Sequence, residues 1–146
     1  MFDNKLAALF TTAALAAVLL ANCSPHRSIS RDEAVSEIRA ARSTAAAAQL
    51  LIDFVLQGHS TRHYAEGQTI YLQASVERSL NKLKRAVAEP GAEDSVHQCQ
   101  TTLDRLAHEL AAVRAAIVHG DTNALARARR RMSEIQQSPG KTNPSS

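Results

Sequence analysis

The sequence predicts an all-α protein, an up-and-down helical bundle of three long helices and a shorter fourth. The 123 residues after Cys23 are rich in Ala, Leu, Arg, Glu and Gln, and their only aromatic residues are Phe54, Tyr64 and Tyr71. Unbranched side chains lose little rotamer freedom in a helix, whereas strands favour β-branched and aromatic residues. Apolar residues recur at helical spacing between Gly- and Pro-containing breaks. A stretch of this length corresponds to one domain.

Helix boundaries follow from capping residues. Ser30 and Glu33 have the spacing of a capping box, which predicts a first helix over residues 31–57. Gly58 favours the left-handed conformation that ends helices, and Ser60 or Thr61 can cap a second helix that runs to about residue 89. Pro90-Gly91 then stops this helix.

The second half of the chain predicts two more helices. Glu93 and Asp94 place carboxylates at the positive end of a third helix, which ends at His119-Gly120. Asp121 can cap the fourth helix, which ends before Ser138-Pro139-Gly140. We therefore expect a bundle domain over residues 31–137 and a disordered tail over residues 138–146.

Each helix has apolar residues three and four positions apart. The third helix has an unbroken series: Val96, Cys99, Leu103, Leu106, Leu110, Val113 and Ile117. The first helix repeats the spacing with small residues in its middle: Ile38, Ala41, Ala45, Ala48, Ile52 and Val55. Shorter series occupy the second and fourth helices: Val76, Leu80, Leu83 and Val87, then Leu125, Ala128, Met132 and Ile135. These series predict the buried faces of a bundle.

Cys99 lies in the apolar series of the third helix. We expect it to be a small buried hydrophobic residue. The alternative is an intermolecular disulfide, since Cys99 would be the one free thiol of an exported chain.

One flank of the first helix is more apolar than the core requires. Leu50 and Phe54 lie one turn apart on the side opposite the predicted core face. The fourth helix could fold back over them, and this is the simpler expectation. Alternatively, the flank binds a protein partner or a second copy of the chain, and Tyr64, Ile70 and Tyr71 would extend the same surface.

The N-terminal segment predicts export. Lys5 precedes an uncharged run of fifteen residues from Leu6 to Leu20, which is shorter than the roughly 20 residues that a membrane-spanning helix needs. Residues 1–22 are therefore interpreted as a signal peptide. Ordinary secretion with cleavage near Cys23 and an uncleaved anchor are the alternatives.

The sequence Leu20-Ala21-Asn22-Cys23 resembles the lipobox of bacterial lipoproteins, although Asn22 replaces the Gly, Ala or Ser usual before the cysteine. The resemblance implies that Cys23 becomes a diacylated first residue and that residues 23–30 form a lipidated tether. Ser24 is not the aspartate that signals inner-membrane retention in such proteins. The resemblance thus favours an anchor in the outer membrane, facing the periplasm.

The densest positive charge lies on the fourth helix, at Arg127, Arg129, Arg130 and Arg131. We interpret these residues as a solvated basic flank, with docking onto anionic lipid head groups as the alternative. The net charge of +3 is mild and argues against a nucleic-acid partner.

The sequence contains no recognisable catalytic or cofactor motif, so we expect neither an enzyme nor a bound cofactor. The rival hypothesis is a metal- or haem-binding bundle, with His59 and His63 as weak candidate ligands together with His97 and His108.

Taken together, these features predict a non-enzymatic, membrane-tethered envelope lipoprotein whose bundle binds another envelope protein. An envelope chaperone or sensor is a further alternative, and a homodimer is compatible with the sequence.

Overall fold

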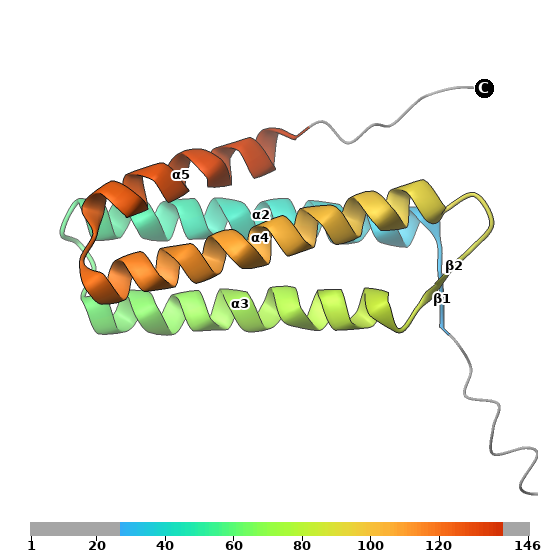
Figure 1. Ribbon diagram of the computed structural model, residues 1–146, viewed down its shortest axis with the longest axis horizontal. Helices are drawn as coiled ribbons and strands as arrows, with labels where there is room; N and C mark the ends of the chain where they lie inside the picture. The colour runs from blue at the N-terminus through green and yellow to red at the C-terminus, as the bar shows by residue number, and fades with distance from the viewer. Residues whose placement is uncertain (1–26, 139–146) are drawn as a thin grey trace, which may run out of the picture.

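A computed structural model describes residues 27–138, which form an all-α bundle (Figure 1). Its helices are α2 (Arg31–Leu56), α3 (Arg62–Lys84), α4 (Glu93–His119) and α5 (Thr122–Gln137). The predicted fold class, three long helices with a shorter fourth, is confirmed. The leader, Cys23 and the tail from residue 139 lie outside the described residues.

The helix ends form where the capping residues predict them. The Ser30 hydroxyl accepts a hydrogen bond from the Glu33 amide at 3.2 Å. Gly58 has a φ of 73° and follows the last turn of α2, where the His59 amide donates to the Phe54 carbonyl at 2.8 Å. These two bonds fix the first and last turns of α2.

The turn between α4 and α5 uses the same chemistry. Gly120 has a φ of 67°, and the Asp121 carboxylate accepts a hydrogen bond from the Ala124 amide at 2.8 Å. The positive φ explains why glycine stands at this position, and the carboxylate satisfies an amide that would otherwise have no partner.

The four helices do not pack equally. α4 packs against α2, α3 and α5, and α5 lies against both α2 and α4. α2 and α3 contact each other more sparsely than any other packed pair of helices. In Figure 1, α3 and α5 lie on opposite sides of α4. Because α2 contacts both α5 and α3, one side of α2 faces α5 and another faces α3.

The predicted apolar series form the core. All members of the α4 series from Cys99 to Ile117 are buried, and Val96 at its start is partly buried. The α5 series is buried throughout, as is the alanine layer of α2. In the first half of α3 the core positions are Ala65 and Thr69, and the Thr69 hydroxyl is satisfied by the Ala65 carbonyl at 2.8 Å.

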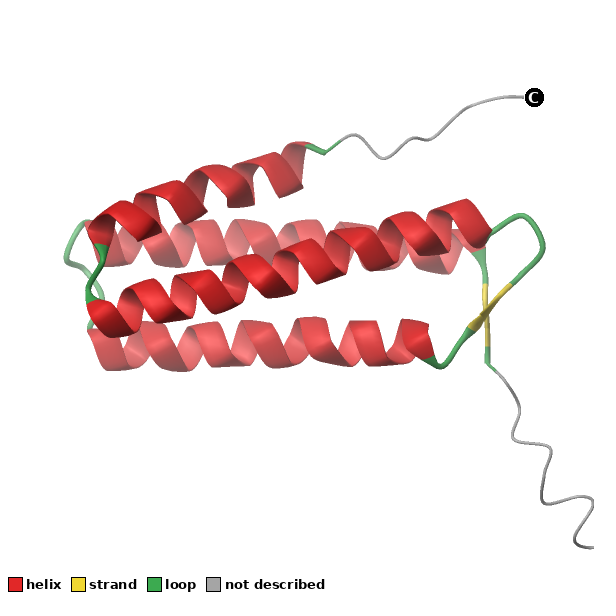
Figure 2. Cartoon of the chain, in the orientation of Figure 1, coloured by secondary structure: helices red, strands yellow, loops and turns green. Residues whose placement is uncertain are grey.

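The predicted end of the second helix is wrong. α3 ends at Lys84 rather than near residue 89, and Val87 is an exposed residue of strand β2 (Val87–Ala88). β2 pairs in parallel with β1 (Ser28–Ile29), and the two short strands lie at one end of the bundle in Figure 2. The Val87 amide donates to the Arg27 carbonyl and the Glu89 amide to the Ile29 carbonyl, each at 3.0 Å.

This pairing also corrects the expected tether. Residues 27–30, expected to be part of the lipidated tether over residues 23–30, are fixed to the bundle, and Ile29 is only 1% exposed. The chain therefore joins the core before α2 begins. Within residues 27–138, no helix is sufficiently long and apolar to span a membrane.

Candidate interaction site between α2 and α3

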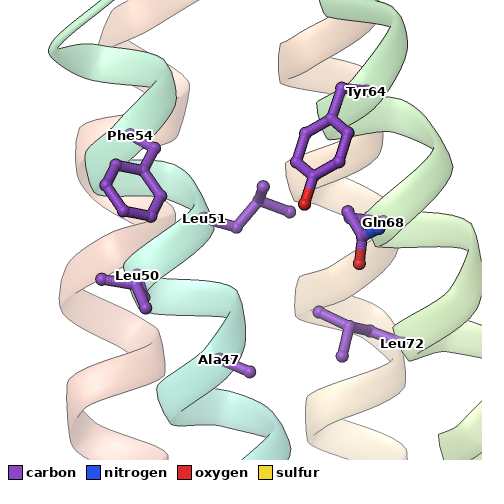
Figure 3. A pocket seen from close by; sticks show the side chains of 7 residues that line it. All are labelled: Ala47, Leu50, Leu51, Phe54, Tyr64, Gln68 and Leu72. Atoms are coloured by element: carbon purple, nitrogen blue, oxygen red, sulfur yellow. The ribbon is translucent and has the colours of Figure 1, made fainter. Parts of the chain in front are cut away.

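An apolar groove of about 160 Å³ lies between α2 and α3 near the turn that joins them (Figure 3). Its lining residues come from both helices: Ala47, Leu50, Leu51 and Phe54 from α2, and Tyr64, Gln68 and Leu72 from α3. We call this site the α2–α3 groove. Leu51 is buried and points from α2 toward α3, whereas Leu50 and Phe54 are 56% and 44% exposed. A large part of the apolar lining is therefore accessible to a ligand.

Away from the groove, toward β1, polar contacts close the interface between α2 and α3. The Glu37 carboxylate accepts hydrogen bonds from the Ser79 hydroxyl at 2.9 Å and from Lys82 Nζ at 2.6 Å. Lys82 Nζ also lies 2.9 Å from the Glu33 carboxylate. The Lys82 hydrogen bond lowers the pKa of Glu33, and the hydrogen bonds to Glu37 and then Glu33 raise the pKa of Lys82. These contacts hold the helices together near β1 and confine the groove to the other end.

The simpler expectation for the apolar flank, that the fourth helix covers Leu50 and Phe54, is wrong. α5 does pack on α2, but it meets a different side of the helix. Arg129 Nε lies 2.6 Å from the Asp53 carboxylate, and the Gln136 amide donates to Gln49 at 2.6 Å. Asp53 and Gln49 lie on one side of Leu50 and Phe54, so α5 leaves the groove open.

The groove is flanked by few charges. Residues 43–56 of α2 and 63–76 of α3 contain only two acidic or basic residues other than histidine, namely Asp53 and Glu66. Asp53 is paired with Arg129, and Glu66 lies 3.3 Å from Arg114 of α4. Both carboxylates are therefore engaged within the bundle, and a ligand in the groove meets mainly apolar atoms with the Tyr64 hydroxyl and the Gln68 amide.

The sequence prediction identified part of this site. Leu50, Phe54 and Tyr64 line the groove as expected for one surface. Tyr71 and Ile70 are exposed but do not line it. The sequence reasoning missed four lining residues: Ala47, Leu51, Gln68 and Leu72. The 3-4 spacing that runs from Ala47 through Leu50 to Phe54 could have revealed the first of them.

The four arginines of α5 divide into two pairs. Arg129 binds Asp53, and Arg131 Nε lies 2.6 Å from the carboxylate of Glu109, whose side chain is only 8% exposed. Arg127 and Arg130 are exposed and form no ion pair within residues 27–138. The predicted solvated flank therefore holds for Arg127 and Arg130, on which the alternative of docking onto anionic lipid would depend, while Arg129 and Arg131 form ion pairs with the rest of the bundle.

The four candidate histidines are exposed. His59 lies in the turn after Gly58 and His63 in the first turn of α3, so they do not share one helical face. His97 and His108 are exposed on α4. No group of three or more His, Cys, Asp or Glu side chains in the described part of the chain is arranged to hold a metal ion.

Cys99 is a buried free thiol, as the helical spacing predicts. The pKa of this thiol is raised to about 11, chiefly by burial and to a smaller extent by the nearby Glu37 carboxylate, while Lys82 opposes the shift. A buried and protonated thiol is poorly placed for an intermolecular disulfide.

Comparison of the chain with protein-family models, with curated protein sequences and with solved structures found no match.

Proposed function

We propose that this chain is a non-enzymatic, lipid-tethered envelope protein that acts by binding another envelope protein through the α2–α3 groove. The observation that carries the proposal is the open apolar groove lined by Leu50, Phe54 and Tyr64. Contiguous exposed apolar surface of this kind commonly marks a protein interaction site, and aromatic side chains are frequent anchors there.

The tether in this proposal rests on the sequence. The run from Leu6 to Leu20 and the tetrapeptide ending at Cys23 support export and lipidation. The described chain begins at Arg27, at the β1 end of the bundle and opposite the α2–α3 turn (Figure 1). A lipid on Cys23 would thus hold the β1 end near the membrane and leave the groove at the other end. The outer membrane, facing the periplasm, is the favoured location.

The tether is tested by labelling cells with radioactive palmitate. We expect the full-length chain to be labelled and the Cys23→Ser variant to remain unlabelled. A Cys99→Ser variant serves as the control and should be labelled like the natural chain. Label that persists in Cys23→Ser, or that never appears, would remove the lipid anchor from the proposal.

The binding role is tested by co-purification from cells that produce a tagged full-length chain. Phe54→Ser should lose the bound protein, whereas Ile70→Ser should retain it. Ile70 is a matched control, because it is 43% exposed against 44% for Phe54 and lies outside the groove. Equal recovery with both variants, or no specific partner with the natural chain, would contradict the proposed function.

A further inference from the structure

The surface of α2 carries a second series of residues with coiled-coil spacing. Its members are successively four and three positions apart, all are exposed, and none is charged: Ser36, Ala40, Ser43, Ala47, Leu50, Phe54 and Gln57. We call this series the outer seam. It lies on the side of α2 opposite the buried alanine layer, and its last large residues form part of the α2–α3 groove. Four of its members are apolar, namely Ala40, Ala47, Leu50 and Phe54. Because these four share one exposed face at coiled-coil spacing, a partner helix with apolar residues at the same spacing can pack along it.

The side chains of the outer seam become larger from the β1 end of α2 toward the α2–α3 turn. Toward β1 its side chains are the small Ser36, Ala40 and Ser43, whereas toward the turn they are Leu50 and Phe54. The groove beside Leu50 and Phe54 is roomy enough to accept one large apolar side chain from a ligand. The small residues allow a second helix to approach the α2 backbone closely.

The lipid expected on Cys23 is a poor occupant of the groove. The four residues from Cys23 to Arg27 span at most about 14 Å. Ala47, the first groove residue, lies sixteen positions after Arg31, which is about 24 Å along α2. An acyl chain would have to leave the bilayer and run back along the bundle, losing about 0.8 kcal/mol for each methylene withdrawn.

A second copy of the chain also fits poorly. Two copies tethered to one membrane at their β1 ends would meet with their α2 helices parallel. Parallel packing sets Phe54 against Phe54 and Ala40 against Ala40, so the seam would be crowded at one end and empty at the other. Antiparallel packing would match large residues with small ones, but it would place the two tethers about 40 Å apart at opposite ends.

We infer that the occupant of the α2–α3 groove is an amphipathic helix of another protein, which packs along the outer seam of α2 with an uncharged apolar face. This inference rests on the proposed function and specifies its partner. One large apolar side chain of the helix fills the groove between Leu51 and Leu72, and larger side chains lie over Ala40 and Ser43. Its contacting face is uncharged because the seam offers no charge to pair with.

The test uses photo-crosslinking in cells that produce the full-length chain. A benzoylphenylalanine residue is placed separately at Phe54, at Ala40 and, as the control, at Ile70, and the crosslinked peptides are mapped by mass spectrometry. Phe54 and Ala40 are fourteen residues apart on α2, or about 21 Å. If a helix packs along the seam, the two adducts should map to one partner segment at sites about fourteen residues apart, and Ile70 should give no such adduct. Circular dichroism of each variant confirms that the bundle is intact.

The other outcomes overturn the inference in different ways. Adduct sites only about six residues apart would indicate an extended partner segment, because a strand covers the same 21 Å in that length. Adducts only with a second copy or with lipid would replace the helix as the occupant. Adducts with another protein at the wrong spacing would leave the proposed function standing. The absence of any adduct with another protein from Phe54 or Ala40 would end both proposals.

Discussion

At the scale of single residues, burial controls the reactivity of Cys99. The side chain has no exposed surface, and burial raises the pKa of the thiol to about 11, so the reactive thiolate is scarce at neutral pH. We expect Ellman's reagent to label Cys99 about a hundredfold more slowly in the folded chain than in guanidinium, because the rise of the pKa from 9.0 to about 11 reduces the thiolate fraction by about that factor. The rates are measured in a Cys23→Ser background so that one thiol remains. Equal rates in the two conditions would show that Cys99 is open to solvent.

The cluster around Lys82 makes stability depend on pH in a definite direction. The pKa of Glu33 is lowered from 4.5, so its stabilising contribution is present above that value and is lost as the pH falls through its folded pKa. The pKa of Lys82 is raised from 10.5, so its contribution is present below that value and is lost as the pH rises through its folded pKa.

We therefore expect Lys82→Gln to lower the free energy of unfolding most between pH 4.5 and 10.5, with a smaller effect at the acidic and alkaline extremes. Urea unfolding at a series of pH values measures this difference. Lys84→Gln is the matched control, because Lys84 lies in the same last turn of α3 but is exposed. A similar pH profile for both variants would mean that the helix end, rather than the Glu33 and Glu37 contacts, is responsible.

At the scale of elements, α5 is held by an ion pair as well as by its apolar stripe. Arg131 reaches from α5 to the nearly buried carboxylate of Glu109 on α4, and its removal would leave that carboxylate without its partner. We expect Arg131→Leu to reduce the free energy of unfolding by about 1–3 kcal/mol. Arg130→Leu should change it by less than about 0.5 kcal/mol, because Arg130 is an exposed surface residue. Denaturant unfolding of the two neighbouring variants decides whether the pair stabilises the bundle.

The elements that the sequence predicted correctly are those with local signals. Gly58, Gly120 and Asp121 fix chain turns through bonds to residues a few positions away, and the apolar spacing of α4 repeats within each turn of the helix. Both kinds of signal can be found in a short window of sequence. This is why the number of helices and the buried faces of α4 and α5 were predictable.

The errors concern contacts between distant parts of the chain. Val87 fits the helical spacing of α3, but it pairs instead with Ser28, about sixty positions earlier in the sequence. Likewise, the expectation that the fourth helix covers Leu50 and Phe54 is wrong, because the cover depends on which side of α2 receives α5. Both contacts are determined by tertiary packing, and neither produces a pattern within a short window of sequence. The groove was therefore only half predictable, through its exposed rim and not through its floor at Leu51 and Leu72.

At the scale of the whole molecule, the bundle has one closed end and one partly open end. The β1–β2 pairing and the Lys82 cluster join β1 and the start of α2 to the end of α3 and to β2, whereas the opposite end leaves the α2–α3 groove accessible (Figure 1). A tether at residue 23 would adjoin the closed end. A force on the tether would then act first on the β1–β2 pairing and on the ion pairs of Lys82. The groove, at the other end, would remain accessible to a partner.

The closed end depends on Ile29, which belongs to the hydrophobic core although it precedes the first helix of the bundle. Replacement by alanine removes buried apolar atoms and leaves a cavity, so we expect Ile29→Ala to lower the free energy of unfolding by about 2–5 kcal/mol. Ile70→Ala is the control, because Ile70 is 43% exposed and its truncation should cost less than about 0.5 kcal/mol. If residues 27–30 were only a flexible tether, the two variants would unfold at the same urea concentration. A clear difference between them would mean that the segment leading to the expected lipid anchor is a structural part of the bundle, so that any partner in the groove binds a body held rigidly to its tether.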